Sequence, residues 1–277
     1  GFDTKQSFFL DFMSNPAPNL QADVSVNVVG NVPANPIDEL FYESPAVPRE
    51  VNASGIELEG KLSAFEVMWQ NLYHLMVKET GKHQAFLPPD YPYYVLVESE
   101  GADEEREAEQ FMTVLGNLME EGHVADAVIA QSGQQASQLW EMRDDIETIV
   151  LTLYPVVPFD ISLPIREMES YVTGIEKALE EQLPGSRLVV FGHLGDSNIH
   201  VVVGKTEDRE AVENIVYGGL RDIVGSISAE HGIGLEKRAY LHCSRSDTEI
   251  ALMRTLKAAL DPKNLLNPGK VLEPTGG

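Results

Sequence analysis

The 277-residue chain has one cysteine, few basic residues and no long apolar run. A single cysteine excludes an intrachain disulfide and favours a reducing compartment, so we expect a cytoplasmic protein. Lysine and arginine number 20 against 44 acidic residues, a formal charge of −24, which argues against nucleic acid or an anionic membrane as partner. No stretch approaches the ~20 apolar residues of a membrane span. The hydrophobic fraction of 43% is ordinary for a globular protein.

Two histidines flank a predicted turn in the segment FGHLGDSNIH, residues 191–200. The four residues 195–198 are all turn formers, and the flanking runs 188–191 and 199–203 are rich in β-branched and aromatic residues, which predicts a β-hairpin. A symmetric turn closing between residues 196 and 197 places His193 directly opposite His200, with Cβ atoms roughly 5 Å apart. Two imidazoles at that distance can bind one metal ion.

The segment SAEHGIG, residues 228–234, adds a carboxylate and a third histidine. Two histidines and a carboxylate form a common catalytic zinc set that leaves a fourth position open, and Glu230 is the candidate carboxylate. Gly232 and Gly234 indicate backbone that runs close to a ligand. His231 is the adjacent candidate base. In the alternative interpretation, the two opposed histidines merely stack or bind solvent.

Three ordered motifs together resemble a known family. They read GHLGDSNIH at 192–200, AEHGIG at 229–234 and DPKNLLNPGK at 261–270. The resemblance is to the C-terminal domain of FAD-linked oxidases of the vanillyl-alcohol oxidase superfamily, in the group of D-lactate, D-2-hydroxyglutarate and glycolate dehydrogenases. The segments LSAFE at 62–66 and FDISLP at 159–164 extend it over about residues 60–271.

The resemblance implies roles for individual residues. By it, His193, His200 and Glu230 bind a divalent metal, often zinc. His231 acts as the base and Arg143 holds the substrate carboxylate. Asn267 and Lys270 are implied as contacts of FAD, which is bound mainly by another domain.

Four positions depart from the family pattern. Ser197 replaces the middle glycine of the hairpin turn, a mild change because serine also forms turns. Glu147 stands where a threonine is frequent, Pro158 where a lysine is frequent, and Val202 where an asparagine is frequent. The metal ligands are present while part of the carboxylate clamp is replaced, so the substrate is left open. A different distal group on the substrate, or weak activity, would fit.

The pattern of elements predicts an α+β fold. Residues 1–60 are rich in proline and are predicted to be irregular, or the tail of a preceding FAD-binding domain; the strand-like run 24–29 lies among them. Residues 61–277 are expected to form the substrate and metal domain. Its order is βαβ, helix, βαβ, βα, which favours two ferredoxin-like split βαβ units in one mostly antiparallel sheet. Helices are predicted at 62–78, after Asp103, and at 134–147, 166–182, 209–226 and 247–260, and strands at 93–97, 124–129, 159–163, 187–193 and 198–203.

These observations favour the substrate-side domain of a flavin-dependent dehydrogenase that oxidises a 2-hydroxy acid with help from a divalent metal. The expected partners are the small acid substrate and an FAD-binding domain; a homodimer is left open, as is the electron acceptor. A metal-dependent hydrolase using the same ligands is the first alternative, and esterase activity would favour it. A non-catalytic interaction module of the same fold is the second.

Overall fold

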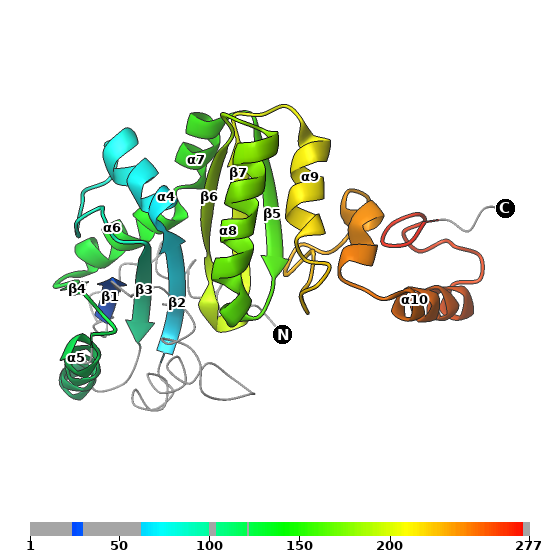
Figure 1. The fold of residues 1–277 in the computed structure, drawn as a ribbon. Coiled ribbons are helices and arrows are strands. Elements are labelled where there is room, and N and C mark those ends of the chain that lie inside the picture. The colour runs from blue at the N-terminus through cyan, green and yellow to red at the C-terminus, as the bar shows by residue number, and fades with distance from the viewer. Residues whose placement is uncertain (1–23, 30–61, 100–103, 121, 274–277) are drawn as a thin grey trace.

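The computed structural model describes residues 24–29, 62–99, 104–120 and 122–273. Seven strands form one sheet in the order β4-β1-β3-β2-β6-β7-β5 (Figure 1). Every neighbouring pair in it is antiparallel. The strands are β1 (Val24–Val29), β2 (Leu62–Trp69), β3 (Tyr93–Ser99), β4 (Asp126–Ile129), β5 (Val156–Ser162), β6 (Arg187–His193) and β7 (Asn198–Gly204). The predicted α+β fold with an antiparallel sheet is therefore confirmed.

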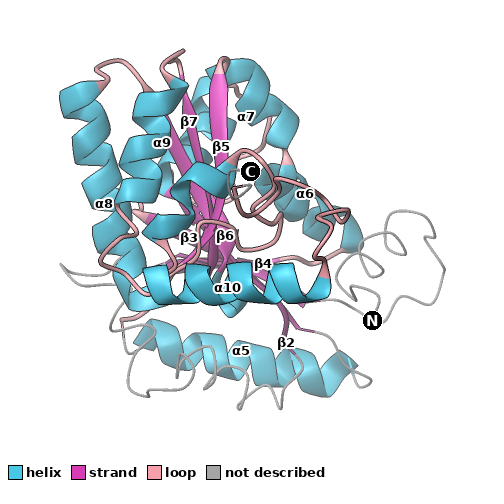
Figure 2. Cartoon of the chain, turned by 90° about the vertical axis from the view of Figure 1, so that its right-hand side faces the viewer, coloured by secondary structure: helices cyan, strands magenta, loops and turns pink. Residues whose placement is uncertain are grey.

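Helices cover both faces of the sheet, as the edge-on view of Figure 2 shows. On one side lie α8 (Ile165–Gln182) and α9 (Arg209–Gly218), and on the other α6 (Gly133–Asp144) and α7 (Ile146–Leu153). The remaining helices are α4 (Gln70–His74), the π-helix η1 (Leu75–Glu79), α5 (Glu104–Glu120), the 3₁₀ helices η2 (Leu194–Asp196) and η3 (Lys237–Cys243), and α10 (Asp247–Leu260).

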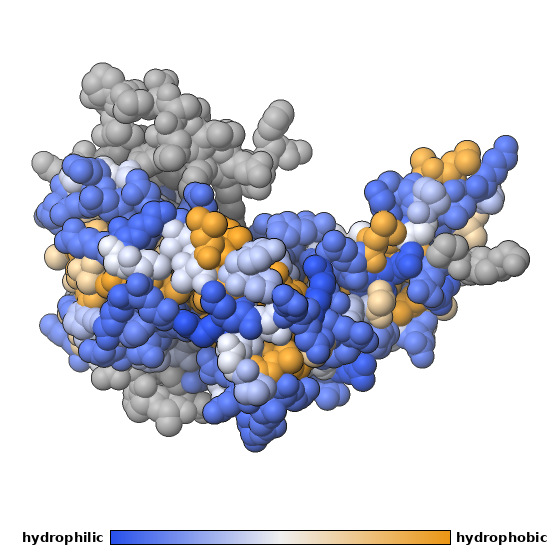
Figure 3. All heavy atoms as spheres, turned by 90° about the horizontal axis from the view of Figure 1, so that it is seen from above, coloured by the Kyte–Doolittle hydropathy of each residue, from blue (hydrophilic) through white to orange (hydrophobic). Residues whose placement is uncertain are grey.

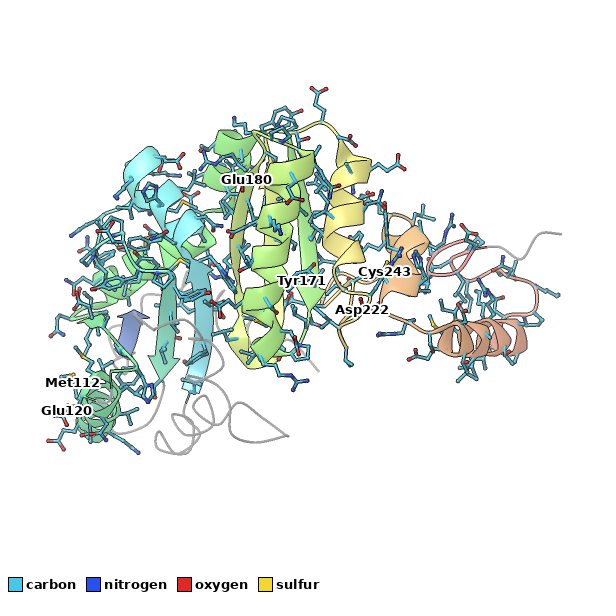
Figure 4. All side chains as sticks on the ribbon, in the orientation of Figure 1. Met112, Glu120, Tyr171, Glu180, Asp222 and Cys243 are labelled. Atoms are coloured by element: carbon cyan, nitrogen blue, oxygen red, sulfur yellow. The ribbon has the colours of Figure 1, made fainter. Side chains whose placement is uncertain are left out.

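Alternation along the central strands divides the core between the two faces. Val190 and Val201 face α8 and α9 and belong to one core cluster. Tyr171 of α8, which is labelled in Figure 4, belongs to the same cluster. The Tyr171 hydroxyl donates to the Val216 carbonyl oxygen at 2.7 Å and so ties α8 to α9. Val189 and Val202 face the opposite cluster, which contains Met142 and Ile149. Because both faces are buried, these strands read as nearly continuous apolar runs.

Several predicted elements are confirmed, among them the strands at 93–97, 187–193 and 198–203 and the helices at 166–182 and 247–260. The helix predicted at 62–78 is wrong for its first half, because residues 62–69 form β2. Phe65, Met68, Trp69 and Leu72 match a helical stripe, but a strand buried on both faces offers the same apolar density. Pairing with β3 on one side and β6 on the other decides the conformation. The cap expected at Asp103 lies outside the described residues.

Residues 24–29 form β1, which pairs with β3 and β4 inside the sheet. They lie within the segment predicted to be irregular, so this part of residues 1–60 shares the sheet of the following domain. The division of the chain near residue 60 stays a prediction.

The C-terminal part of the chain extends away from the sheet. In Figure 1, η3 leads to α10 at the side of the molecule beyond α9, and Cys243 lies in η3 (Figure 4). A capping box begins α10: Ser246 accepts from the Glu249 backbone, and the Glu249 side chain accepts from the Ser246 backbone. The large apolar side chains exposed on this arm are Leu252, Leu256, Leu260, Leu265 and Leu266, at 52–82%. Figure 3 shows apolar atoms in several places on the surface of the arm, among hydrophilic ones. None of the described helices combines the length and apolar character needed to cross a bilayer.

Asp145 divides the helix predicted at 134–147 into α6 and α7. Its side chain accepts from the Thr148 backbone nitrogen at 3.1 Å and so caps α7. It also pairs with Lys82 at 2.8 Å and His83 at 2.7 Å. Burial raises the pKa of Asp145, but the hydrogen bonds from Lys82, His83 and Thr148 outweigh it and hold the pKa well below its ordinary value.

Replacing Asp145 with asparagine is expected to lower the free energy of unfolding by about 1–2 kcal/mol at pH 7. Asparagine caps a helix as well as aspartate, so the loss reports the ion pair with Lys82 and the hydrogen bond of the charged carboxylate with His83. The folded-state pKa is depressed, so the stabilisation is complete above the unfolded value of 3.8 and is lost as pH falls below it. Urea unfolding at pH 7 and pH 3 measures this. The control is Asp208→Asn, a cap of α9 that accepts from Ala211 at 3.0 Å; a difference that stays constant with pH would contradict the assignment.

Candidate functional site

The hairpin between β6 and β7 has a different register from the predicted one. His193 pairs with Asn198, and His200 pairs with Phe191. The prediction that His193 lies directly opposite His200 is therefore wrong, because the turn contains the 3₁₀ helix η2 followed by Ser197 in the left-handed region at φ 56°. Gly192 permits the close pairing, since a Cβ there would lie 2.2 Å from the Asn198 carbonyl oxygen. The two histidines are diagonal neighbours on one face.

A row of polar side chains crosses four strands on the face covered by α6 and α7. Directly paired residues share a face, so the register Glu66–His193–Asn198 aligns these three. The register Asp160–His200 adds the next pair on the same face. Glu66, Asp160 and Asn198 are all at most 5% exposed. Buried polar groups of this kind need partners, which come from the row itself and from the segments packed on it.

Glu66 lies between a guanidinium and an imidazole. Its Oε2 accepts from Arg143 Nη2 at 2.7 Å and Nε at 3.2 Å, while its Oε1 is 2.8 Å from His193 Nδ1. Burial raises the pKa of Glu66, but the hydrogen bond from His193 and the charge of Arg143 outweigh it and lower the pKa. An ionised carboxylate only accepts, so His193 Nδ1 donates, and Nε2 is the free ring nitrogen when His193 is neutral.

The Nε2 atoms of His193 and His200 face each other at 3.2 Å. Burial, with the positive charge of Arg143 and the nearby His193, lowers the pKa of His200 to about 4, so its ring is neutral at pH 7. The two nitrogens can meet at this distance when the hydrogen of one Nε2 is donated to the other, or when both bind one cation that lies off the line joining them. Two nitrogens on one tetrahedral zinc lie about 3.3 Å apart, so the pair fits this geometry.

Glu230 and His231 come from an irregular segment that reaches the same row. Glu230 Oε1 accepts from Asn198 Nδ2 at 2.9 Å and is 3.9 Å from His193 Nε2. His231 is 69% exposed, with Nδ1 3.7 Å from Asp160 Oδ2. Burial raises the pKa of Asp160, but backbone hydrogen bonds from Glu230 and His231 and the charge of Lys237 outweigh it and lower the pKa.

The three predicted metal ligands thus lie near one another, but Glu230 Oε1 is 3.9 Å from His193 Nε2, farther apart than two ligand atoms of one tetrahedral zinc. Within the described ranges, no group of three or more His, Cys, Asp or Glu side chains is arranged to hold a metal ion. Asp160 Oδ1 and Asn198 Oδ1 are buried without a hydrogen-bond partner, so this end of the row has unused acceptors. Metal binding by His193, His200 and Glu230 stays a prediction.

Arg143 lies behind Glu66 and is 4% exposed. Its Nη1 donates to Asp144 at 3.1 Å, and its guanidinium carbon lies 4.7 Å from the centre of the Phe191 ring. In this arrangement, the guanidinium is engaged by two carboxylates of the chain. An incoming substrate carboxylate would have to displace one of them. The substrate-binding role of Arg143 stays a prediction.

Asn267 and Lys270 are exposed and lie in the turn that follows α10. The Lys270 backbone nitrogen donates to the Asn267 carbonyl oxygen at 3.2 Å. The next residue, Val271, donates to the Gly234 carbonyl oxygen at 2.9 Å and links this turn to the end of the Glu230 segment. Their contact with a flavin stays a prediction.

Sequence reasoning missed Glu66, Asp160 and Asn198 as members of the site. The signal was present for two of them: Glu66 interrupts the apolar run FEVMW and Asp160 interrupts the run VVPFDIS. A charged residue inside a buried strand is rarely unpaired. Asn198 gave no such signal, because it follows three other turn-forming residues and was interpreted as part of the turn.

Comparison with known proteins identifies the family. Residues 50–271 match the model of FAD linked oxidases, C-terminal domain. D-2-hydroxyglutarate dehydrogenase of Xanthomonas citri pv. viticola is 40% identical over 223 residues, covering 77% of this chain and 46% of that protein. The mitochondrial D-2-hydroxyglutarate dehydrogenase of Rattus norvegicus is 35% identical over 217 residues, covering 76% and 39%. A putative mitochondrial D-lactate dehydrogenase of Schizosaccharomyces pombe is 34% identical over 222 residues, covering 76% and 42%.

The chain belongs to the FAD-linked oxidase C-terminal domain family, and the resemblance seen in its motifs is confirmed. It spans less than half the length of these curated relatives. Among solved structures, p-cresol methylhydroxylase with substrate bound has a TM-score of 0.62 at 10% identity, covering 94% of this chain and 55% of that one. 4-Ethylphenol oxidase from Gulosibacter chungangensis has a TM-score of 0.53 at 12% identity, covering 94% and 55%. These two likenesses concern the fold alone.

Replacing Glu66 with glutamine is expected to lower the free energy of unfolding by roughly 3 kcal/mol, because it leaves buried Arg143 without its main counter-charge. The matched control is Glu79→Gln. Glu79 also pairs with an arginine, Arg187, at 2.6 Å, but both side chains are at least 35% exposed. The control should lose less than about 1 kcal/mol. Urea unfolding of both variants tests this, and equal losses would show that Glu66 is not the electrostatic centre of the site.

Proposed function

We propose that this chain is the substrate-side domain of a flavin-dependent dehydrogenase that oxidises a 2-hydroxy acid to the 2-oxo acid. The observation that carries the proposal is the convergence of His193, His200, Glu230 and His231 on one face of the sheet. The names of the relatives, D-2-hydroxyglutarate dehydrogenase and putative D-lactate dehydrogenase, support this substrate class. The replacements at Glu147, Pro158 and Val202 leave the particular acid open.

The proposed cofactor is FAD, held mainly by a separate FAD-binding domain that is the proposed partner. The family description and the greater length of the relatives support it. Five exposed leucines on the C-terminal arm also favour a covering partner, because exposed apolar side chains that gather on one part of a protein are typical of an interaction surface. Asn267 and Lys270 are exposed on the same arm and so are available to a cofactor that the partner holds. FAD would supply the acceptor for the hydride from C2 of the acid.

The proposed metal is a divalent ion, with zinc as the first candidate, held by His193, His200 and Glu230. The spacing of the two imidazoles, the low pKa of His200 and the carboxylate behind His193 support it, because ligand histidines are neutral and commonly donate their other nitrogen to a carboxylate. Glu230 would have to approach the pair. A bound ion would lower the pKa of the substrate hydroxyl.

The remaining roles belong to the chain itself. His231 is exposed at the rim of the row, where it can accept the hydroxyl proton. Arg143 is proposed to hold the substrate carboxylate after a rearrangement of its pairs with Glu66 and Asp144. The acidic surface repels an anionic substrate, so this local positive charge is needed. A cytoplasmic location remains a proposal; several relatives carry the word mitochondrial in their names.

The metal assignment is tested by elemental mass spectrometry of the chain purified without chelators and supplied with zinc. About one metal ion per chain is expected for the wild type, with loss in His200→Ala. The control is His74→Ala, because His74 contacts Glu79, the partner of Arg187 at the opposite end of β6. Absence of metal from the wild type would remove the metal from the proposal.

The reaction is tested in the FAD-loaded protein that contains both this chain and an FAD-binding domain. Dye reduction is followed with D-2-hydroxyglutarate, D-lactate and glycolate. His231→Gln is expected to lower kcat by about 10²- to 10⁴-fold, because it removes the base. His242→Gln, at an exposed histidine of η3, is the control. Failure of the loaded wild type on all three acids would overturn the proposal, and ester hydrolysis by this chain alone would favour the hydrolase alternative.

A further inference from the structure

One buried carboxylate holds the segment that carries Glu230 and His231. Asp160 Oδ2 accepts from the Glu230 backbone nitrogen at 2.9 Å and from the His231 backbone nitrogen at 3.0 Å. The Asp160 carbonyl oxygen accepts from the Ala229 nitrogen at 3.2 Å. Three successive residues are therefore bonded to a single residue of β5.

The segment has no regular secondary structure to define its path. Residues 227–236 form bends and turns, without a helix or strand. Before it, Ser226 and Ser162 form an isolated bridge, which brings the chain alongside β5. Beyond that bridge, Asp160 is the point where the backbone of the segment meets the sheet. Burial of Ile227 in the core fixes the start of the segment, and Asp160 then binds the Glu230 and His231 amides.

The position of Asp160 connects this segment to the histidine pair. Asp160 is paired directly with His200 across β5 and β7 and shares its face. The sheet fixes His200 relative to Asp160, and the two backbone hydrogen bonds fix Glu230 and His231 relative to Asp160. The position of the irregular segment relative to the histidines is thus set through Asp160, and the hydrogen bond from Asn198 Nδ2 to Glu230 Oε1 at 2.9 Å is a second link, to β7.

The local charges favour this arrangement. Asp160 is 3% exposed, and Lys237 Nζ is 3.7 Å from its Oδ2. Lys237 also donates to Ser228 Oγ at 2.8 Å, and Ser228 Oγ donates to the Gly232 carbonyl oxygen at 2.9 Å. Lys237 and Ser228 therefore add hydrogen bonds that join the start of the segment to Gly232 and to η3. Hydrogen bonds to a buried ionised acceptor are roughly twice as strong as neutral ones.

We propose that Asp160 is a positioning residue that sets where Glu230 and His231 stand relative to His193 and His200. This inference rests on the proposed function, in which Glu230 binds the metal and His231 accepts the proton. Asp160 itself need not touch the substrate. It acts through the two backbone N–H groups that it accepts.

Amide hydrogen exchange, resolved by NMR, tests the positioning without any turnover. In Asp160→Ala, exchange of the Glu230 and His231 amides should accelerate about 10- to 100-fold, because each loses a charged acceptor. Asp160→Asn, which keeps an oxygen but loses the charge, should give a smaller change and serves if the alanine variant does not fold. Asp208→Asn removes a carboxylate that accepts a backbone N–H elsewhere, from Ala211, and should leave both amides unchanged. Unchanged exchange in folded Asp160 variants would overturn the proposal.

Kinetics of the FAD-loaded protein distinguish positioning from general stability. Asp160→Asn should lower kcat roughly tenfold or more while KM stays within about twofold, because the reacting groups are displaced but substrate binding is kept. Asp208→Asn should leave both constants unchanged. Accelerated exchange with unaltered kcat would also overturn the proposal. A wild type with protected amides and no turnover would instead count against the proposed dehydrogenase function and leave the structural role of Asp160 supported.

Discussion

The buried carboxylate of Glu66 is the interaction on which the rest of the site depends. It lies in the middle of β2, a strand that pairs with β3 and β6, and it binds Arg143 of α6 and His193 of β6 at once. A charge in this position is tolerated only because both partners approach it closely. The pairing fixes the ring of His193, so its Nε2 is directed at His200. One carboxylate thereby joins a helix and two strands and orients the first imidazole.

The site combines rigid and irregular parts. The histidine pair stands on adjacent strands whose backbone bonds define its spacing, whereas Glu230 and His231 belong to a segment of bends and turns. Glu66 and Asp160 are both buried carboxylates of the sheet that position other groups of the site. Glu66 binds the imidazole of His193, and Asp160 accepts hydrogen bonds from the Glu230 and His231 backbone N–H groups. The groups proposed to react are consequently the more exposed ones, while the groups that hold them are buried.

The C-terminal arm, residues 247–273, differs from the sheet in how its apolar side chains are exposed. Of the hydrophobic side chains of α10, Ile250 is buried, whereas Leu252, Leu256 and Leu260 are largely exposed. An exposed apolar face of this kind is typical of an interaction surface. The Asn267–Lys270 turn lies on this arm, and its backbone link to Gly234 joins it to the Glu230 segment. If the proposed FAD-binding partner covered this arm, it would lie next to the Glu230 segment.

The amino-acid sequence by itself determined the family, the α+β class and most of the elements from residue 93 onward, because motifs and side-chain periodicity are local properties. It also supplied the residues His193, His200 and Glu230. Only the tertiary structure decided that residues 62–69 form a strand, since its second half is buried on both faces and lacks a distinguishing period. It alone decided the register of the hairpin, which depends on a left-handed Ser197 and the close approach at Gly192. The roles of Glu66 and Asp160 likewise required the structure, because their partners lie 77 and 70 residues away along the chain.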